Sequence, residues 1–151
     1  LLLEFAARVK RGETKLGRKV YLMFSVNEEV SHGASAGLPA DVEDVLIVDM
    51  GCVGGDLEGD ATRVSIDAKD AGGPNNYQMT TRLIELAKQH ELEFAVDVFT
   101  SYSSDAATAL RAGYDVRHGL IGAGVYASHG YERSHVDGVK NTFKLLCAYL
   151  G

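Results

Sequence analysis

The sequence predicts an α/β protein with three layers, in which helices cover both faces of a mixed, mostly parallel sheet. Two observations support this fold class. Short apolar segments typical of buried strands alternate along the chain with amphipathic helical segments. The 151 residues, of which 46% are hydrophobic and 24% charged, have the size and composition of one globular domain. Residues 1–151 are therefore expected to form a single domain.

The chain opens within a helical pattern. Apolar residues recur at helical spacing up to about Arg11, and Gly12 follows as a helix end. No capping residue precedes Leu1. We therefore expect this helix to continue an earlier segment, so that the chain is the C-terminal part of a longer domain whose sheet is incomplete at its N-terminal side.

Three strands are expected in the first half of the chain. Residues 19–25 (KVYLMFS) and 44–50 (DVLIVDM) are short, mostly apolar runs, and each is typical of a strand buried on both faces. Apolar and polar residues alternate weakly over 63–68, which is the third candidate strand. Glycines and turn-forming residues predict loops over 52–60 and 71–76.

Helices and strands alternate in the second half. A helix begins near Tyr77, with Asn75 or Asn76 as its cap, because apolar residues form one stripe from Met79 onward. A strand over 92–99, a helix over 105–112, a strand within 116–125 and an amphipathic helix over 136–150 follow. This order favours βα units around a sheet.

Charge and cysteine content exclude several classes of protein. The net charge of −6 and the pI near 5.3 argue against a nucleic acid or an anionic membrane surface as partner. No apolar run approaches the roughly 18 residues of a membrane span. Cys52 and Cys147 lie far apart and outside any CxxC pair, which favours a reduced, cytoplasmic protein.

Acidic residues and a histidine follow the expected strands. Glu28 and Glu29 come after the first strand, Asp49 ends the next, Asp105 follows a later one, and His129 follows the last. In open α/β sheets, ligands bind at the carboxyl ends of the strands. We therefore expect these side chains to converge on one rim of the sheet.

Each of these residues also has a simpler explanation. Adjacent glutamates can divide into a metal ligand and a general base, but such a pair is more often a solvated acidic turn. Asp49 fits an Asx-turn or a cap as well as a metal site. His129 competes with His135, six residues on, whose default role is helix capping or exposure.

Four blocks of sequence together resemble a known family. VYLMFSVNEEV, VLIVDMG, SYSSDAATALRAG and LIGAGVYASHGYERSH occur in the order and spacing of the glutamyl and deblocking aminopeptidases, which are also called tetrahedral aminopeptidases. Asp49 stands twenty residues after Glu29, and Ile121-Gly122 ends seven residues before His129, as in that family. The resemblance covers nearly the whole chain.

The resemblance implies a function and a set of site residues. Glu28 would be the general base, Glu29 and His129 would bind one metal, and Asp49 would bind the other, with Asp105 and His135 as secondary candidates. Two divalent ions, zinc or alternatively cobalt or manganese, would activate water against the N-terminal peptide bond of peptide substrates. A histidine and a bridging aspartate, together with a dimerisation domain, would lie upstream of Leu1, so the 151 residues alone would be inactive. The full-length protein would be a homo-oligomer, a dodecamer by resemblance.

Two other functions remain open at this point. A related co-catalytic hydrolase, such as a carboxypeptidase or a deacylase, would use the same residue types on another amide. A non-catalytic, metal-binding assembly subunit would have no need for a glutamate at position 28. Gly130 stands where the family usually has serine, and residues 54–76 depart from its pattern, so the substrate preference does not carry over.

Overall fold

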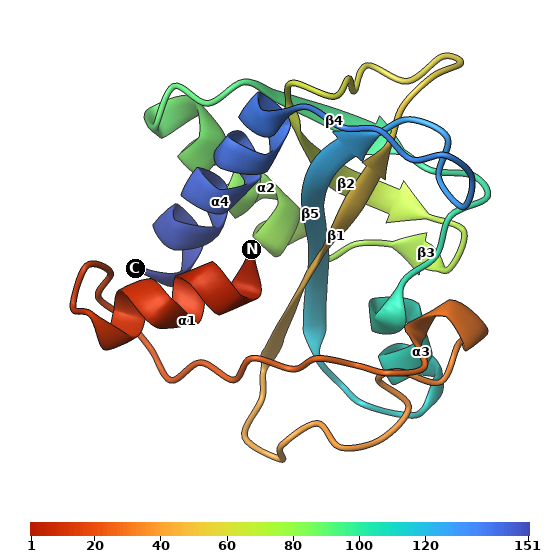
Figure 1. The fold of residues 1–151 in the computed structure, drawn as a ribbon. Coiled ribbons are helices and arrows are strands. Elements are labelled where there is room, and N and C mark those ends of the chain that lie inside the picture. Colours follow the sequence, from red (N-terminus) through yellow and green to blue (C-terminus); the bar gives the residue numbers. More distant parts are fainter.

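A mixed sheet lies between two layers of helices in the computed structural model, which describes all residues from 1 to 151 (Figure 1). Helices α1, α2 and α4 cover one face, and α3 lies on the other. The elements in chain order are α1 (Leu2–Lys10), the 3₁₀ turn η1 (Glu28–Val30), β1 (Asp44–Cys52), β2 (Val64–Asp70), β3 (Gly73–Pro74), α2 (Tyr77–Gln89), β4 (Phe94–Val98), α3 (Asp105–Arg111), β5 (Arg117–Val125) and α4 (Val136–Leu150). The predicted three-layer α/β fold is confirmed.

The strand order shows why the sheet is mixed. β1 pairs with β5 in parallel along its whole length, and β5 pairs with β2 in antiparallel fashion. On its other side β2 pairs with β4 in parallel, and the short β3 extends β2 as an antiparallel partner. Because β4 follows the direction of β2, it runs opposite to β1 and β5. The segment after β4 therefore starts at the other end of the sheet from the segments that follow β1 and β5.

The hydrophobic core occupies one side of the sheet. Alternate residues of β2 and β5, such as Val64, Ile66 and Ile121, are fully buried against Leu83 of α2 and Leu145 of α4. Successive side chains of a strand point to opposite faces, so the intervening residues face α3. These residues are polar: Ser65 and Asp67 in β2 and Asp97 in β4.

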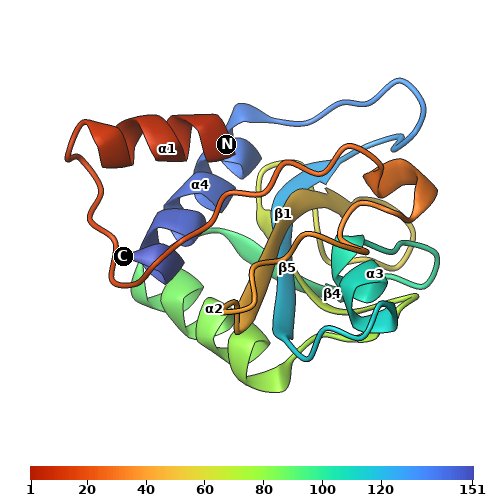
Figure 2. The ribbon, with the colours of Figure 1, turned by 90° about the horizontal axis from the view of Figure 1, so that it is seen from below.

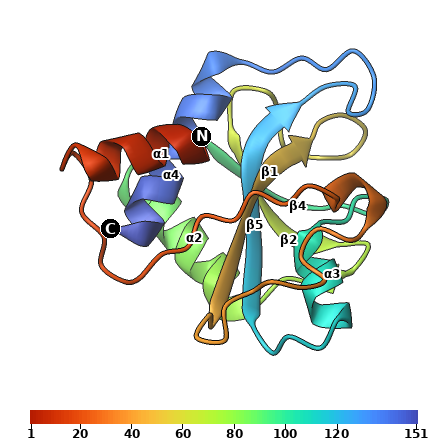
Figure 3. The same ribbon diagram turned by 60° about the horizontal axis from the view of Figure 1, so that its bottom comes forward.

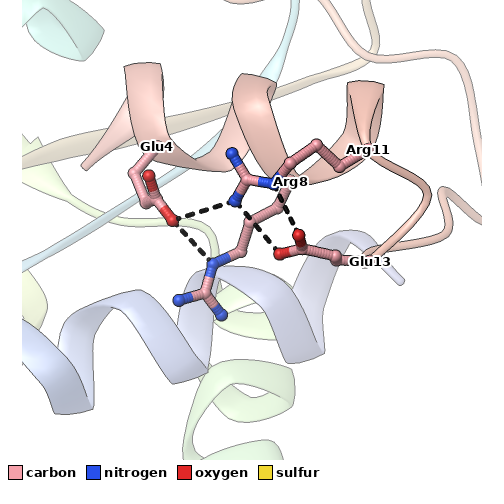
Figure 4. Close-up of polar contacts among 4 residues, drawn as sticks. All are labelled: Glu4, Arg8, Arg11 and Glu13. Carbon is pink, nitrogen blue, oxygen red and sulfur yellow. Dashed lines mark hydrogen bonds and ion pairs between the residues drawn. The ribbon is translucent and has the colours of Figure 1, made fainter.

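The helices begin and end at the residues that the sequence indicates. Asn76 caps α2 by accepting a hydrogen bond from the backbone N–H of Met79 at 3.0 Å, and Ser104 caps α3. One side of α1 carries half-exposed ion pairs, in which Arg8 Nε donates to Glu4 Oε1 at 2.9 Å and Arg11 joins Glu13 (Figure 4). Exposed pairs of this kind add little stability. Buried Phe5, with Leu2 and Val9 beside it, packs α1 against the core.

The strand expected over residues 19–25 does not form. The chain is extended there, but no backbone hydrogen bond involves any residue from Arg18 to Val26. Val20 and Leu22 pack against the core, whereas Tyr21, Met23 and Phe24 are exposed. The expectation of a strand buried on both faces is wrong because nothing pairs with this segment or covers its outer side.

An open groove separates this extended segment from the sheet. Figures 2 and 3 show the chain leaving α1, passing along β1 and reaching η1 beside α3. A cavity of about 1070 Å³, lined from residues 17–26 on one side and from β1 on the other, lies between them. The outer edge of β1 is consequently free, because β5 is its only partner in the sheet.

Two further features bear on the expectations from sequence. No helix has the length and apolar character that crossing a membrane requires. Both Cys52 and Cys147 are free thiols.

Candidate active site

A cleft of about 1150 Å³ gathers most of the candidate residues. Glu28, Glu29, Asp49 and His129 all line it, although they come from η1, β1 and the loop after β5. The loops over 54–57 and 98–104 form the rest of its wall. The structure thus brings four residues from distant parts of the chain to one place.

Glu29 and His129 face each other across the cleft. Nε2 of His129 lies 3.2 Å from Oε2 of Glu29, and both side chains are about three-quarters exposed. Glu29 lies in the single turn of η1, which ends at Ser31 in the left-handed backbone conformation.

The loop after β5 holds His129 in an uncommon backbone conformation. Its φ is +64°, and Ala127 two residues earlier has a φ of +55°. Non-glycine residues adopt such values rarely, so the surrounding structure must enforce them. Here the N–H of His129 donates to Glu132 Oε1 at 3.0 Å, and the N–H of Gly130 donates to the carbonyl of Ala127 at 2.8 Å. This tight turn directs the imidazole towards Glu29.

Asp49 lies within β1, three residues before the strand ends. Its register partner in β5 is Gly122, where a Cβ would collide with the backbone of Asp49 and Met50, so only glycine allows this close pairing. Burial raises the pKa of Asp49, and the charges of Glu29 and Asp105 raise it further. The Tyr102 hydroxyl and the Met50 backbone oppose that rise.

Glu28 is the more sheltered of the two adjacent glutamates. Burial raises the pKa of Glu28, the carboxylates of Asp49, Asp105 and Glu29 add to the rise, and His129 counteracts it. A carboxyl group with a raised pKa in a cleft is better suited to proton transfer than an ordinary surface glutamate.

Asp105 is an anchor for the loop that follows η1. It is buried, and its Oδ1 accepts a hydrogen bond from the N–H of Ala34 at 3.0 Å. A Cβ on Gly33 would overlap both carboxylate oxygens, so the loop approaches as closely as glycine permits. Asp105 borders the groove beside β1 rather than the main cleft. Asp105 shares that groove with Glu28, Glu29 and Asp49 but, unlike them, does not line the cleft that holds His129.

His135 caps a helix. Its Nδ1 accepts a hydrogen bond from the N–H of Asp137 at 3.2 Å at the start of α4, and it lines neither the cleft nor the groove. Of the two competing histidines, only His129 lies in the cleft.

Sequence reasoning missed Tyr102. Its ring lies in the cleft wall between β4 and α3, and its hydroxyl is buried without a hydrogen-bond partner. Burial raises the pKa of Tyr102, as do the nearby charges of Asp49, Glu28 and Cys52, so the phenol stays protonated. The only signal in the sequence was an aromatic residue among serines in a loop that follows a strand.

The donor atoms in the cleft suit a divalent metal. Imidazole nitrogen and carboxylate oxygen are ligands of zinc, cobalt and manganese. Two donors on one tetrahedral zinc, with bonds of about 2.0–2.1 Å, are about 3.3 Å apart, which fits the 3.2 Å between Glu29 and His129. No group of three or more His, Cys, Asp or Glu side chains within these 151 residues is arranged to hold a metal.

Together, the three-layer fold and a cleft lined by carboxylates and one imidazole define a class of α/β proteins with a polar binding site at the sheet. Within that class the chain belongs to the M42 glutamyl aminopeptidase family, whose family model matches residues 1–145.

Individual relatives agree with this assignment. The chain is 37% identical over 150 residues to YhfE of Bacillus subtilis (strain 168), a protein named for a predicted aminopeptidase activity; the match covers 99% of this chain and 43% of YhfE. A TET aminopeptidase from the marine sediment archaeon Thaumarchaeota archaeon SCGC AB-539-E09 superposes with a TM-score of 0.79 at 21% identity, over 99% of this chain and 45% of that one. The TET1 peptidase of Pyrococcus horikoshii superposes with a TM-score of 0.71 at 20% identity, over 84% and 39%. The chain therefore spans less than half the length of these relatives.

Proposed function

We propose that these residues are the C-terminal part of the catalytic domain of a metal-dependent aminopeptidase, a hydrolase that removes N-terminal residues from peptides. The observation that carries the proposal is the 3.2 Å approach of Glu29 to His129 beside Glu28, in a chain of this family.

Four residues have distinct roles in this proposal. Glu29 and His129 hold one divalent ion, and Asp49 holds a second. When bound, two such ions supply the Lewis acidity that makes water a nucleophile near neutral pH. The remaining ligands come from polypeptide outside these 151 residues, since the relatives are more than twice as long.

Glu28 handles the proton. Its carboxylate accepts a proton from the attacking water and returns it to the amine that leaves when the peptide bond breaks. The raised pKa of Glu28 supports this role, because it brings the carboxyl group closer to the working pH. The exposure of the cleft on one side leaves room for an extended peptide.

The proposal extends to the longer protein. We place it in the cytoplasm, and we expect it to be a homo-oligomer, as the P. horikoshii relative can assemble into a tetrahedron or a large octahedral shell. Sedimentation of the parent protein tests this assembly.

Hydrolysis of small amides tests the activity. The parent protein, loaded with zinc, cobalt or manganese, is assayed on aminoacyl p-nitroanilides, on their Nα-acetylated forms and on C-terminally free dipeptides blocked at the amine. Turnover only of substrates with a free amine, lost with a chelator and restored by metal, is expected. Turnover of the blocked dipeptides instead would identify a carboxypeptidase or deacylase, and no turnover with bound metal would favour an assembly subunit.

A further inference from the structure

Tyr102 is held rigidly in the wall of the cleft. Its ring packs edge-on against Phe99, with centroids 5.5 Å apart and planes at 69°. Its backbone carbonyl accepts a hydrogen bond from the N–H of Ala71 at 2.8 Å, which ties the loop between β4 and α3 to the turn after β2. Both ends of the residue are therefore fixed, and the hydroxyl has a defined position.

That hydroxyl has no partner, although it is buried. A buried O–H without an acceptor is destabilising, and packing alone would be served equally well by phenylalanine. The carboxylates close enough to act on the phenol are those of Asp49 and Glu28, and Asp49 acts most strongly. The hydroxyl thus lies close enough to the Asp49 carboxylate to oppose the rise of its pKa, but its position does not meet the geometry of a hydrogen bond.

We propose that Tyr102 is a positioning residue for Asp49: its hydroxyl donates a hydrogen bond to the Asp49 carboxylate once that carboxylate is fixed as a metal ligand. A carboxylate has four lone-pair sites, so one oxygen can bind metal while the other accepts from the phenol. Partners of this kind orient the ligand, and removing them weakens metal binding. The inference rests on the proposed function for the identity of Asp49 as a ligand.

The geometry of the loop supports this assignment over a contact with substrate. The hydroxyl oxygen has less than 1 Å² of accessible surface, so a bound peptide does not reach it. Asp49 is the carboxylate that acts on it most strongly, and it projects from β1 towards the face of the sheet on which α3 lies, since Val48 beside it packs against the core on the other face. An ionised carboxylate can only accept hydrogen bonds, so the phenol hydroxyl is the donor of this pair.

A double-mutant cycle on zinc affinity tests the inference. The parent protein and its variants Tyr102→Phe, Asp49→Asn and the double variant are titrated with zinc against a chromophoric chelator, and their melting temperatures are measured without metal. Tyr102→Phe should weaken the affinity of one zinc site by about 10-fold or more and leave the melting temperature unchanged or higher. In the Asp49→Asn background, Tyr102→Phe should change the zinc affinity by less than about 2-fold. The residue that accepts the phenol hydrogen bond is then neutral and no longer a metal ligand.

Tyr131→Phe is the matched control, since Tyr131 follows His129 closely but is 88% exposed and lies outside the cleft. Zinc affinity of Tyr102→Phe equal to that of the parent, or an equal loss in both backgrounds, would overturn the inference while the proposed function stands. A parent protein that binds no zinc, cobalt or manganese would overturn the proposed function and this inference with it.

Discussion

Nε2 of His129 lies 3.2 Å from Oε2 of Glu29, which joins the turn before β1 to the loop after the last strand. Both side chains are about three-quarters exposed at the mouth of the cleft. The same spacing suits two ligands of one metal. Variants of these two residues and of their neighbours can therefore separate a ligand from a base and from a structural residue.

Glu28→Gln in the parent protein should abolish most activity without loss of metal. Glutamine keeps the size and hydrogen bonding of Glu28 but cannot accept the proton, so kcat should fall by at least about 10²-fold. Metal content and melting temperature should change little. Glu29→Gln should instead lose metal and activity together, because a ligand is damaged. Near-normal turnover by Glu28→Gln, or equal metal loss in both variants, would contradict this division of roles.

The two histidines should respond differently to alanine. His129→Ala removes the partner of Glu29 and should weaken metal binding, as measured by chelator competition, with little change in stability because the side chain is exposed. His135→Ala removes the acceptor for the Asp137 N–H at the start of α4. It should cost about 1 kcal/mol in chemical denaturation and leave metal affinity unchanged. Weaker metal binding in His135→Ala, with no change in His129→Ala, would identify His135 as the ligand instead.

Asp105 and Gly33 should be energetically coupled. Asp105→Ala leaves the Ala34 N–H without its buried acceptor and should destabilise the protein by about 1–3 kcal/mol. Gly33→Ala should also destabilise it, because its Cβ overlaps the Asp105 carboxylate. In the double variant that clash is gone, so the combined loss of unfolding free energy should be smaller than the sum of the two. Strict additivity would mean that the loop is held by other contacts.

Asp67 should make stability depend on pH. It is fully buried on the α3 side of the sheet, where it accepts from the Lys69 N–H at 3.0 Å and from Asn75 Nδ2 at 2.8 Å. Burial, reinforced by the charge of Asp70, raises the pKa of Asp67 to about 6.

The sign of this dependence follows from the raised value. The native state holds the proton more tightly than the unfolded chain, so the stabilising contribution is complete below pH 3.8 and is lost as pH rises through about 6. Between pH 4 and pH 7 the parent should therefore lose up to about 3 kcal/mol of unfolding free energy that Asp67→Asn does not lose. Denaturant titrations at both pH values measure the shift. Glu85→Gln, on the exposed side of α2, is the control that should show none.

Most of the fold could be predicted from the sequence because local patterns agree with the tertiary structure. The stripe from Met79 to Leu86 is buried in α2, and the apolar run at 44–50 is β1, which begins at the predicted residue and ends two residues later. Asn76 caps its helix as expected. In these segments the hydrophobic periodicity and the turn residues indicate the same element, so the local sequence is enough to predict it.

The remaining features depend on contacts between distant segments. Residues 19–25 have the composition of a buried strand, but pairing needs a neighbour that composition does not supply. The direction of β4, and with it the position of Asp105, follows from sheet topology. Glu28, Glu29, Asp49 and His129 could be chosen from their places along the chain, whereas the Tyr102 hydroxyl could be found only once burial was known.

The free edge of β1 and the unpaired segment beside it also matter for handling the protein. An edge strand has backbone N–H and C=O groups without partners, and another chain can pair with them as an added strand. This pairing is a common cause of edge-to-edge aggregation, and exposed apolar side chains nearby favour it. Phe24 is 58% exposed and Val26 is 92% exposed at this place. A preparation of residues 1–151 alone should therefore self-associate as its concentration rises, and a charged residue at Phe24 is a better remedy than any change near the cleft.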